Sequence, residues 1–252
     1  MTNRPTQRRE SITPVWERPE PMTRPAPVPL SRELIVRAAI AIADDAGLAA
    51  VSVRKVAAAL DAGPMRLYGY LSSKDELLEL MVDAVYGEIM STGPIDPDWR
   101  AGIKALTRRV RTAAGRHPWF VELLGGRPHQ GPHALAYLEA LFAALDTTPG
   151  GENIDSMMRA ARTINAYTIG ALRNEAHEWR TELDTGMDKT EWQIANAPYL
   201  FRMIATGRFP HLENVIQDAT HPPPDEVFEQ GLDTVLDGVA ALPKYPPQPR
   251  WR

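Results

Sequence analysis

Apolar residues recur at helical spacing along almost the whole chain of 252 residues, and this periodicity limits the folds that it can adopt. The first clear stretch follows Ser31, a good helix cap, and ends at Gly47. One face of this predicted helix carries Leu34, Ile35, Ala38, Ala39, Ile42 and Ala43. No segment alternates apolar and polar residues between turn signals, as a half-buried strand would. The sequence therefore predicts an all-α protein.

Two short helices joined by a tight turn are predicted close to the N-terminus. Ser52 can cap the first, and the tripeptide at 61–63, Asp-Ala-Gly, ends it. The second is predicted over 64–71, because proline suits a first helical position. A longer helix follows over 73–89, with its cap at Ser73 and acidic residues in its first turn. This order is typical of a helix-turn-helix.

Composition divides the chain into four parts. Residues 1–29 hold seven prolines and five arginines, so we expect a disordered arm that has too little apolar surface to offset its ordering entropy. Residues 30–90 form the predicted DNA-binding domain, a three-helix helix-turn-helix followed by the helix over 73–89, and residues 91–243 form a larger helical bundle. Residues 244–252 are rich in proline and form a predicted flexible tail.

The bundle is predicted to contain six helices separated by glycine and proline signals. They cover residues 97–115, 118–124, 132–145, 154–179, 190–206 and 224–242. The helices over 154–179 and 224–242 have the broadest apolar faces. Such faces favour burial against other helices, within the subunit or between subunits.

Several classes of protein are excluded by what the sequence lacks. Without cysteine, there is no disulfide framework, thiolate metal site or thiol nucleophile. No run approaches the ~18 apolar residues of a membrane helix, and the N-terminus lacks a signal-peptide core. We therefore expect a cytoplasmic protein with no membrane partner. No catalytic or phosphate-binding motif is present, so no catalytic residue and no cofactor are predicted.

A metal site is not predicted either. His129 and His133 are four residues apart, which would suit a shared metal on a helix. The dipeptide Gly131-Pro132 lies between them and interrupts that helix. His177, with Glu175 and Glu178, is better explained as part of an exposed helix surface.

The net charge of the whole chain, −4, is unfavourable for nucleic-acid binding, because the DNA backbone is negatively charged. Residues 30–90 hold six basic and nine acidic residues, a net charge of −3. Within them, residues 52–74 hold four basic residues and one acidic residue, a net charge of +3. Positive charge is therefore concentrated at the predicted helix-turn-helix, where DNA would bind.

Residues 52–81, SVRKVAAALDAGPMRLYGYLSSKDELLELM, resemble the DNA-binding domain of the tetracycline-repressor (TetR) family. The resemblance lies in the Ser-x-Arg-Lys-Val-Ala start, the Leu-Tyr pair and Lys74. The later part is similar to the C-terminal domain of this family through the turn at 125–128, residues 167–171 and the segment FEQGLDTVLDGVAAL. Residues 30–242 are covered in all. The resemblance implies a ligand-responsive repressor whose second domain binds ligand and dimerises.

In a helix-turn-helix the second helix enters the major groove of DNA. Arg66 can bind guanine through two hydrogen bonds, and Met65 can contact a thymine methyl. Arg54 can reach a base edge, whereas Ser52, Lys55, Tyr68, Tyr70 and Lys74 are expected to contact phosphates by analogy with the family. The predicted DNA-binding residues are Ser52, Arg54, Lys55, Pro64, Met65, Arg66, Tyr68, Tyr70 and Lys74. The alternatives are a solvated surface for the basic residues and packing against the next helix for Tyr68.

Gly69 departs from the family, which has a larger side chain at this position. The reading surface is therefore smaller, and the operator sequence is not predicted.

The ligand site is expected in the second domain, because pockets combine apolar side chains with a few polar groups. The candidate residues are Trp119, Phe120, Leu123, Arg127, Tyr137, Met158, Asn165, Tyr167, Asn174, His177, Trp192, Met203 and Phe209. Core packing is the alternative for each aromatic residue and methionine. Tetracycline-binding relatives hold a magnesium ion through a histidine and a glutamate at the positions of Leu123 and Asn174. Because leucine cannot bind a metal, the resemblance implies a different inducer, apolar or aromatic.

We expect a homodimer that reads a palindromic operator, because one short helix contacts few base pairs. Its interface is predicted on residues 154–179 and 224–242. Ligand binding is expected to shift the helix after Lys74 and change the separation of the two reading helices. The alternatives are a small all-α enzyme or ligand-binding protein with a vestigial helix-turn-helix, and an activator or DNA organiser of the same fold.

Overall fold

The computed structural model describes residues 13–21, 29–148 and 153–241. Within these ranges the regular elements are helices, and no strand is found, so the all-α prediction is confirmed. The chain divides into two compact units. The first comprises Met1–Gly93 and Arg116–Glu139, and the second comprises Pro94–Gly115 and Ala140–Arg252. None of the described helices is both long and apolar enough to cross a membrane.

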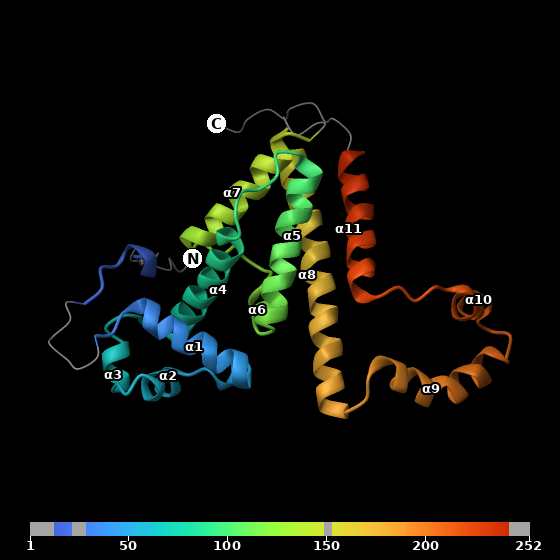
Figure 1. The fold of residues 1–252 in the computed structure, drawn as a ribbon, viewed down its shortest axis with the longest axis horizontal. Coiled ribbons are helices and arrows are strands. Elements are labelled where there is room, and N and C mark those ends of the chain that lie inside the picture. The colour runs from blue at the N-terminus through green and yellow to red at the C-terminus, as the bar shows by residue number, and fades with distance from the viewer. Residues whose placement is uncertain (1–12, 22–28, 149–152, 242–252) are drawn as a thin grey trace, which may run out of the picture. The chain divides into compact units, whose positions relative to one another are not determined.

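The first unit contains the helix-turn-helix in the predicted order (Figure 1). Its helices are α1 (Arg32–Ala46), α2 (Val53–Ala59), α3 (Pro64–Leu67) and α4 (Lys74–Ser91), with a 3-10 turn η2 (Leu48–Ala50) after α1. Ser31, Ser52 and Ser73 cap α1, α2 and α4, each accepting a backbone N–H at 3.2 Å. Gly47 ends α1 at φ 77°, a conformation that favours glycine. The predicted caps are therefore confirmed.

The core of the first unit lies between α1, α2 and α4. α1 packs against both other helices, and α2 packs against α3. The side chains of Ile35, Val56, Leu67, Leu77 and Met81 are fully buried there. Burial of apolar surface, at ~25 cal/mol per Å², is the main stabilising contribution of such a core.

The first unit is larger than the predicted domain of residues 30–90. It also includes α6 (Phe120–Leu123), which packs on α4, and the beginning of α7 (Pro132–Asp146). Phe120 is fully buried, and its ring lies 5.5 Å from that of Tyr86 on α4. Contacts distant in sequence therefore attach this segment to α4.

The expected disorder of the arm is wrong for residues 13–21. They include a short 3-10 helix, η1 (Val15–Glu17), and Val15 is only 2% exposed. One buried side chain and an ion pair from Arg18 to Glu76 hold this part of the arm. Residues 1–12 and 22–28 of the arm, and the tail at 244–252, lie outside the described residues.

The second unit is built on α5 (Trp99–Arg116, up to Gly115), α8 (Ile154–Thr185) and α11 (Pro224–Ala240), with the end of α7. α11 packs along α8 and buries Phe228, Leu232 and Leu236. α8 continues six residues beyond the predicted end, to Thr185, and Gly186 follows it as a left-handed cap with φ 67°. α9 (Lys189–Ile204) is close to its predicted range.

α10 (Pro210–Asp218) was not predicted. It lies between the predicted helices over 190–206 and 224–242, where proline suits the first turn of a helix because no hydrogen-bond donor is needed there.

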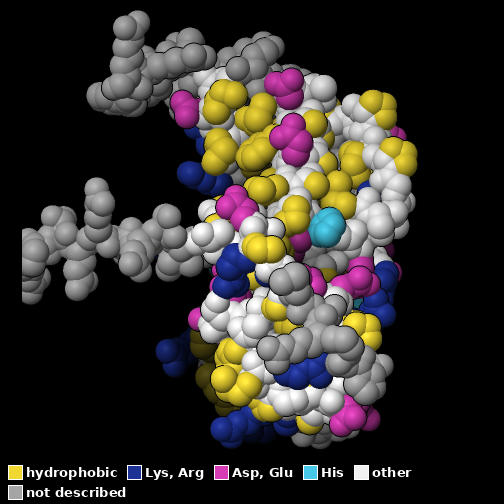
Figure 2. All heavy atoms as spheres, turned by 90° about the vertical axis from the view of Figure 1, so that its left-hand side faces the viewer, with side chains coloured by type: hydrophobic (Ala, Val, Ile, Leu, Met, Phe, Trp, Pro, Cys, Tyr) yellow, Lys and Arg dark blue, Asp and Glu magenta, His cyan; other side chains and the backbone are white. Residues whose placement is uncertain are grey.

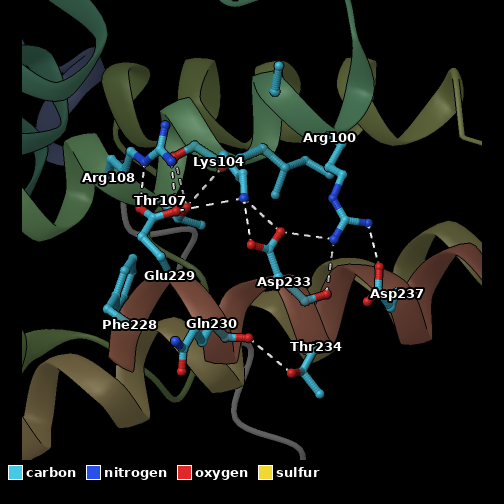
Figure 3. Close-up of polar contacts among 12 residues, drawn as sticks. Arg100, Lys104, Thr107, Arg108, Phe228, Glu229, Gln230, Asp233, Thr234 and Asp237 are labelled. Carbon is cyan, nitrogen blue, oxygen red and sulfur yellow. Dashed lines mark hydrogen bonds and ion pairs between the residues drawn. The ribbon is translucent and has the colours of Figure 1, made fainter. Parts of the chain in front are cut away.

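A row of basic residues on α5 faces a row of acidic residues on α11 (Figure 3). Each row has a spacing of four residues, so its members share one helix face. Arg100 binds Asp233 at 2.9 Å and Asp237 at 2.7 Å. Lys104 binds Asp233 at 2.8 Å, and Arg108 binds Glu229 at 2.7 Å. Hydrogen bonding to Arg108 lowers the pKa of Glu229, and hydrogen bonding to Lys104 and Arg100 lowers the pKa of Asp233. We call these six residues the α5–α11 charge ladder.

Candidate nucleic-acid interface

The reading helix α3 is short and is held by one side chain. Leu67 is fully buried, whereas Met65 on the same helix is 80% exposed. Arg66 and Pro64 are also exposed, and Tyr68 directly after the helix is 49% exposed. Proline at the first position, with Gly63 before it, gives α3 its start. α3 therefore presents Met65 and Arg66 outward, and the expected base contacts remain a prediction.

The basic residues around α3 are also accessible. Arg54 and Lys55 are exposed on α2, while Val53 and Val56 of the same helix are buried. Lys74 is exposed at the beginning of α4. Figure 2 shows Lys and Arg side chains on the lower part of the face that it draws, where Figure 1 places α2 and α3. Such accessible charge suits contacts to DNA phosphates.

Two predicted DNA residues have structural roles. Ser52 is half-buried, and its hydroxyl accepts the N–H of Lys55 as the cap of α2. Tyr70 is 6% exposed, and its hydroxyl donates to the carbonyl oxygen of Leu30 at 2.9 Å. The predicted phosphate contact of Tyr70 is therefore wrong, because its ring and its polar group are both used inside the unit.

The expected ligand residues of the first unit are mostly buried around α4. Trp119, Phe120 and Tyr137 are at most 4% exposed. The ring of Tyr86 on α4 lies 5.2 Å from that of Tyr137. Burial raises the pKa of Tyr86 to about 12, and burial also raises the pKa of Tyr137. Leu123 is half-buried and Arg127 is exposed.

The other expected ligand residues belong to the second unit. Met158, Asn174, His177, Trp192 and Phe209 are exposed, and Asn165 and Met203 are half-buried. Tyr167 on α8 donates its hydroxyl to the carbonyl oxygen of Phe228 on α11 at 2.7 Å. Because the candidates are divided between two units, the ligand site stays a prediction.

A buried carboxylate on α4 was not anticipated from the sequence. Asp83 is 3% exposed and accepts the backbone N–H groups of His133 and Ala134, both at 2.9 Å. Its other oxygen lies 2.8 Å from Nδ1 of His133. Asp83 therefore caps α7 from α4. An acidic residue within the apolar stripe of the helix was the only sequence signal.

His133 is thus engaged by Asp83, and Nε2 of His129 lies 3.1 Å from the carbonyl oxygen of Leu123. Among the described residues, no group of three or more acidic or histidine side chains is suitable for a metal ion.

A second polar cluster joins α1 to the chain before α6. One carboxylate oxygen of Asp44 accepts Nε1–H of Trp119 at 2.6 Å and lies 2.8 Å from Nδ1 of His117. Nε2 of His117 lies 3.4 Å from Glu88 on α4. These partners are far apart in sequence, so no local motif could have revealed them.

An exposed reading helix in a capped helix-turn-helix, together with a separate helical unit, defines the class of helix-turn-helix DNA-binding regulators. The family model for bacterial regulatory proteins of the tetR family matches residues 35–81. The model for the tetracyclin repressor-like C-terminal domain matches residues 93–242. The chain belongs to the TetR family of transcriptional regulators.

Several characterised relatives are similar over most of their length. The transcriptional repressor DrrR1 of Streptomyces coeruleorubidus is 34% identical over 88% of this chain and 81% of its own. The class A tetracycline repressor of transposon 1721 from Escherichia coli is 25% identical over 84% of this chain and 91% of its own length. The structure of Streptomyces coelicolor ActR in complex with actinorhodin matches with a TM-score of 0.70 and 25% identity. The match covers 84% of this chain and 96% of the ActR chain.

Proposed function

We propose that the protein is a ligand-responsive repressor that binds a palindromic operator as a homodimer and is released by a small molecule. The observation that carries the DNA-binding part is the exposure of Met65 and Arg66 on a reading helix anchored by Leu67. The repressor part is supported by DrrR1, which is named a transcriptional repressor. Deletion of the gene is expected to raise transcription of neighbouring genes.

Direct reading of bases is assigned to Arg66, Met65 and Arg54, and phosphate binding to Lys55, Tyr68 and Lys74. A guanidinium that binds guanine contributes about 1–3 kcal/mol of discrimination between bases. Phosphate contacts instead set the position of the protein and make its affinity dependent on salt.

A mobility-shift assay with DNA flanking the gene tests this assignment. We expect a shift that decreases as salt increases, and that is lost when Arg66→Ala and Lys74→Ala are combined. The matched control is Lys189→Ala with Arg202→Ala, which removes the same charge from exposed positions on α9. Absence of any shift, or a shift that survives the first pair, would contradict DNA reading by α3.

The homodimer is supported by apolar side chains that a single chain leaves exposed in the second unit. Ile154 and Met158 on α8 are 68% and 36% exposed. Trp192, Ile194 and Phe201 on α9 are each more than half exposed. Exposed apolar surface of this extent indicates a protein interface. A two-fold dimer also places two reading helices on one palindrome.

The inducer is proposed to be apolar or aromatic. ActR, whose structure contains actinorhodin, supports an organic ligand for this chain. By the family resemblance, Leu123 and Asn174 take the positions of the metal ligands in the tetracycline-binding relatives, so tetracycline with magnesium is expected to leave the DNA complex intact. Release of DNA by tetracycline with magnesium in the same assay would contradict this part of the proposal.

The signal is proposed to pass through α4. This helix packs on both α1 and α6, and Asp83 and Tyr86 connect it to α7. A ligand that binds one arrangement of these contacts better than the other would shift the population of reading-helix positions. An unchanged distance between the two reading helices with inducer bound would contradict this route.

A further inference from the structure

The N-terminal segment Thr13–Pro21 contacts the helix-turn-helix at the end of the reading helix. We call this segment the strap. Val15 is its buried side chain, at 2% exposure. The next contacts come from Arg18, whose guanidinium donates to the Ser72 hydroxyl and to the Glu76 carboxylate. Ser72 lies between α3 and α4, and Glu76 lies in the first turn of α4.

Arg32, the first residue of α1, joins the strap to the same corner. Its Nη1 donates to the carbonyl oxygen of Arg18 at 2.7 Å, and its Nε donates to the carbonyl oxygen of Tyr70 at 3.0 Å. The Arg32 backbone N–H donates to Glu20 at 3.1 Å. The Arg32 guanidinium on α1 is therefore hydrogen-bonded both to the strap, at Arg18, and to Tyr70, which follows the reading helix.

Gly69 provides the space in which the strap ends. A Cβ atom at this position would lie 3.3 Å from Cγ of Pro21 and 3.3 Å from the carbonyl oxygen of Arg66. A side chain larger than methyl would extend further and displace Pro21. The glycine, unexpected from the family resemblance, is thus explained by the proline that lies against it.

α3 needs such support because it has only four residues. A helix of one turn is not stable by itself, since its nucleation cost exceeds what its few hydrogen bonds return. Leu67 is its only buried side chain. The contacts of Arg18, Arg32 and Pro21 add restraints directly after it.

We propose that the strap is a positioning element for operator recognition, which fixes the orientation of α3 so that Arg66 and Met65 meet the bases. This inference rests on the proposed function. If α3 is already held in one orientation, it loses less conformational freedom when it binds DNA. This increases the affinity of the specific complex most, because the base contacts of α3 are made only there.

Two truncations of the full-length protein test the strap. One removes residues 1–21, and the control removes residues 1–12 and keeps the strap. Operator affinity is measured by fluorescence anisotropy on the fragment found by mobility shift, beside a fragment of unrelated sequence. We expect the longer truncation to weaken operator binding about five- to twentyfold, and to weaken unrelated DNA much less than that. The control truncation should stay within about twofold of the full chain.

Substitutions in the complete chain keep the test decisive if the longer truncation fails to fold. Arg18→Ala should reproduce most of the loss of operator affinity, and Arg18→Lys should recover part of it by keeping the charge beside Glu76. Where the longer truncation does fold, Gly69→Val should weaken operator binding more in the full chain than in the chain that lacks residues 1–21, because Pro21 is absent there.

The strap proposal is overturned if Arg18→Ala binds the operator as the full chain does. It is also overturned if both truncations lose the same affinity, because the basic residues of 1–12 would then account for the loss. Equal loss on operator and unrelated DNA indicates a structural role only, which likewise contradicts the proposal. Failure of the unaltered protein to bind any operator would instead contradict the proposed function.

Discussion

A single buried carboxylate, Asp83, connects α4, the helix after the reading helix α3, to the beginning of α7. It accepts two backbone N–H groups that a helix start would otherwise leave without partners. Gly131 is required beside it, because a Cβ atom there would lie 2.2 Å from an Asp83 carboxylate oxygen. At the residue scale, this contact combines charge, capping and close packing.

We predict that Asp83→Ala lowers the free energy of unfolding by about 1–3 kcal/mol, because buried donors at the start of α7 lose their acceptor. Urea denaturation measures this change. Glu79→Ala, an exposed acidic residue on the same helix, is the control and should change it by less than about 0.5 kcal/mol. Equal effects of the two substitutions would show that the cap contributes nothing.

At the scale of elements, α5 and α11 are joined by the α5–α11 charge ladder. The pKa values of Glu229 and Asp233 are lowered by their hydrogen bonds to basic residues of α5. A carboxylate whose pKa is lower in the folded state than in the unfolded state stabilises the fold when the pH is above its unfolded-state pKa. That stabilisation is lost as the pH falls through the folded pKa. Because the ladder is partly exposed, salt also weakens it.

We therefore predict a loss of thermal stability as the pH falls below about 4.5, where free carboxyl groups begin to bind protons. Melting temperatures followed by circular dichroism from pH 7 to pH 3 measure this dependence. The double variant Glu229→Gln with Asp233→Asn should be less stable at pH 7 and should show a shallower decline. A decline as steep as that of the unaltered chain would assign the acid sensitivity to other carboxylates.

At the scale of the whole molecule, the exposed apolar side chains of α8 and α9 form the surface that a second copy would cover in the proposed homodimer. Ile154 and Met158 are four residues apart and share one face of α8. Charged side chains at these positions would have to be desolvated in a dimer, which is costly without partners.

We predict that Ile154→Lys with Met158→Lys shifts the protein toward the monomer in sedimentation-velocity experiments. Operator affinity should decrease with it, because two linked heads bind a palindrome with a higher effective concentration than one. Thr163→Lys, at an exposed position on another face of α8, is the control and should leave the dimer intact. A dimer that persists in the double variant would place the interface elsewhere.

The sequence by itself determined most of the helices, the serine caps of the first unit and the outward side chains of the reading helix α3. Ser31, Ser52 and Ser73 each cap a helix through the residue three positions later, so a short window of sequence contains both partners. The same local logic explains the exposure of Arg66 beside the buried Leu67. The prediction from sequence was wrong for Tyr70, because tyrosine is found both in buried sites and on solvent-exposed surfaces.

Only the tertiary structure decided which distant polar groups meet. Arg18 with Glu76, Asp44 with Trp119 and Asp83 with Ala134 are separated by 58, 75 and 51 positions. No periodicity or cap predicts such pairs, because they depend on how helices pack and on which groups are buried together. For the same reason, the sequence indicated a loose arm where the structure has a strap against the residues that follow the reading helix.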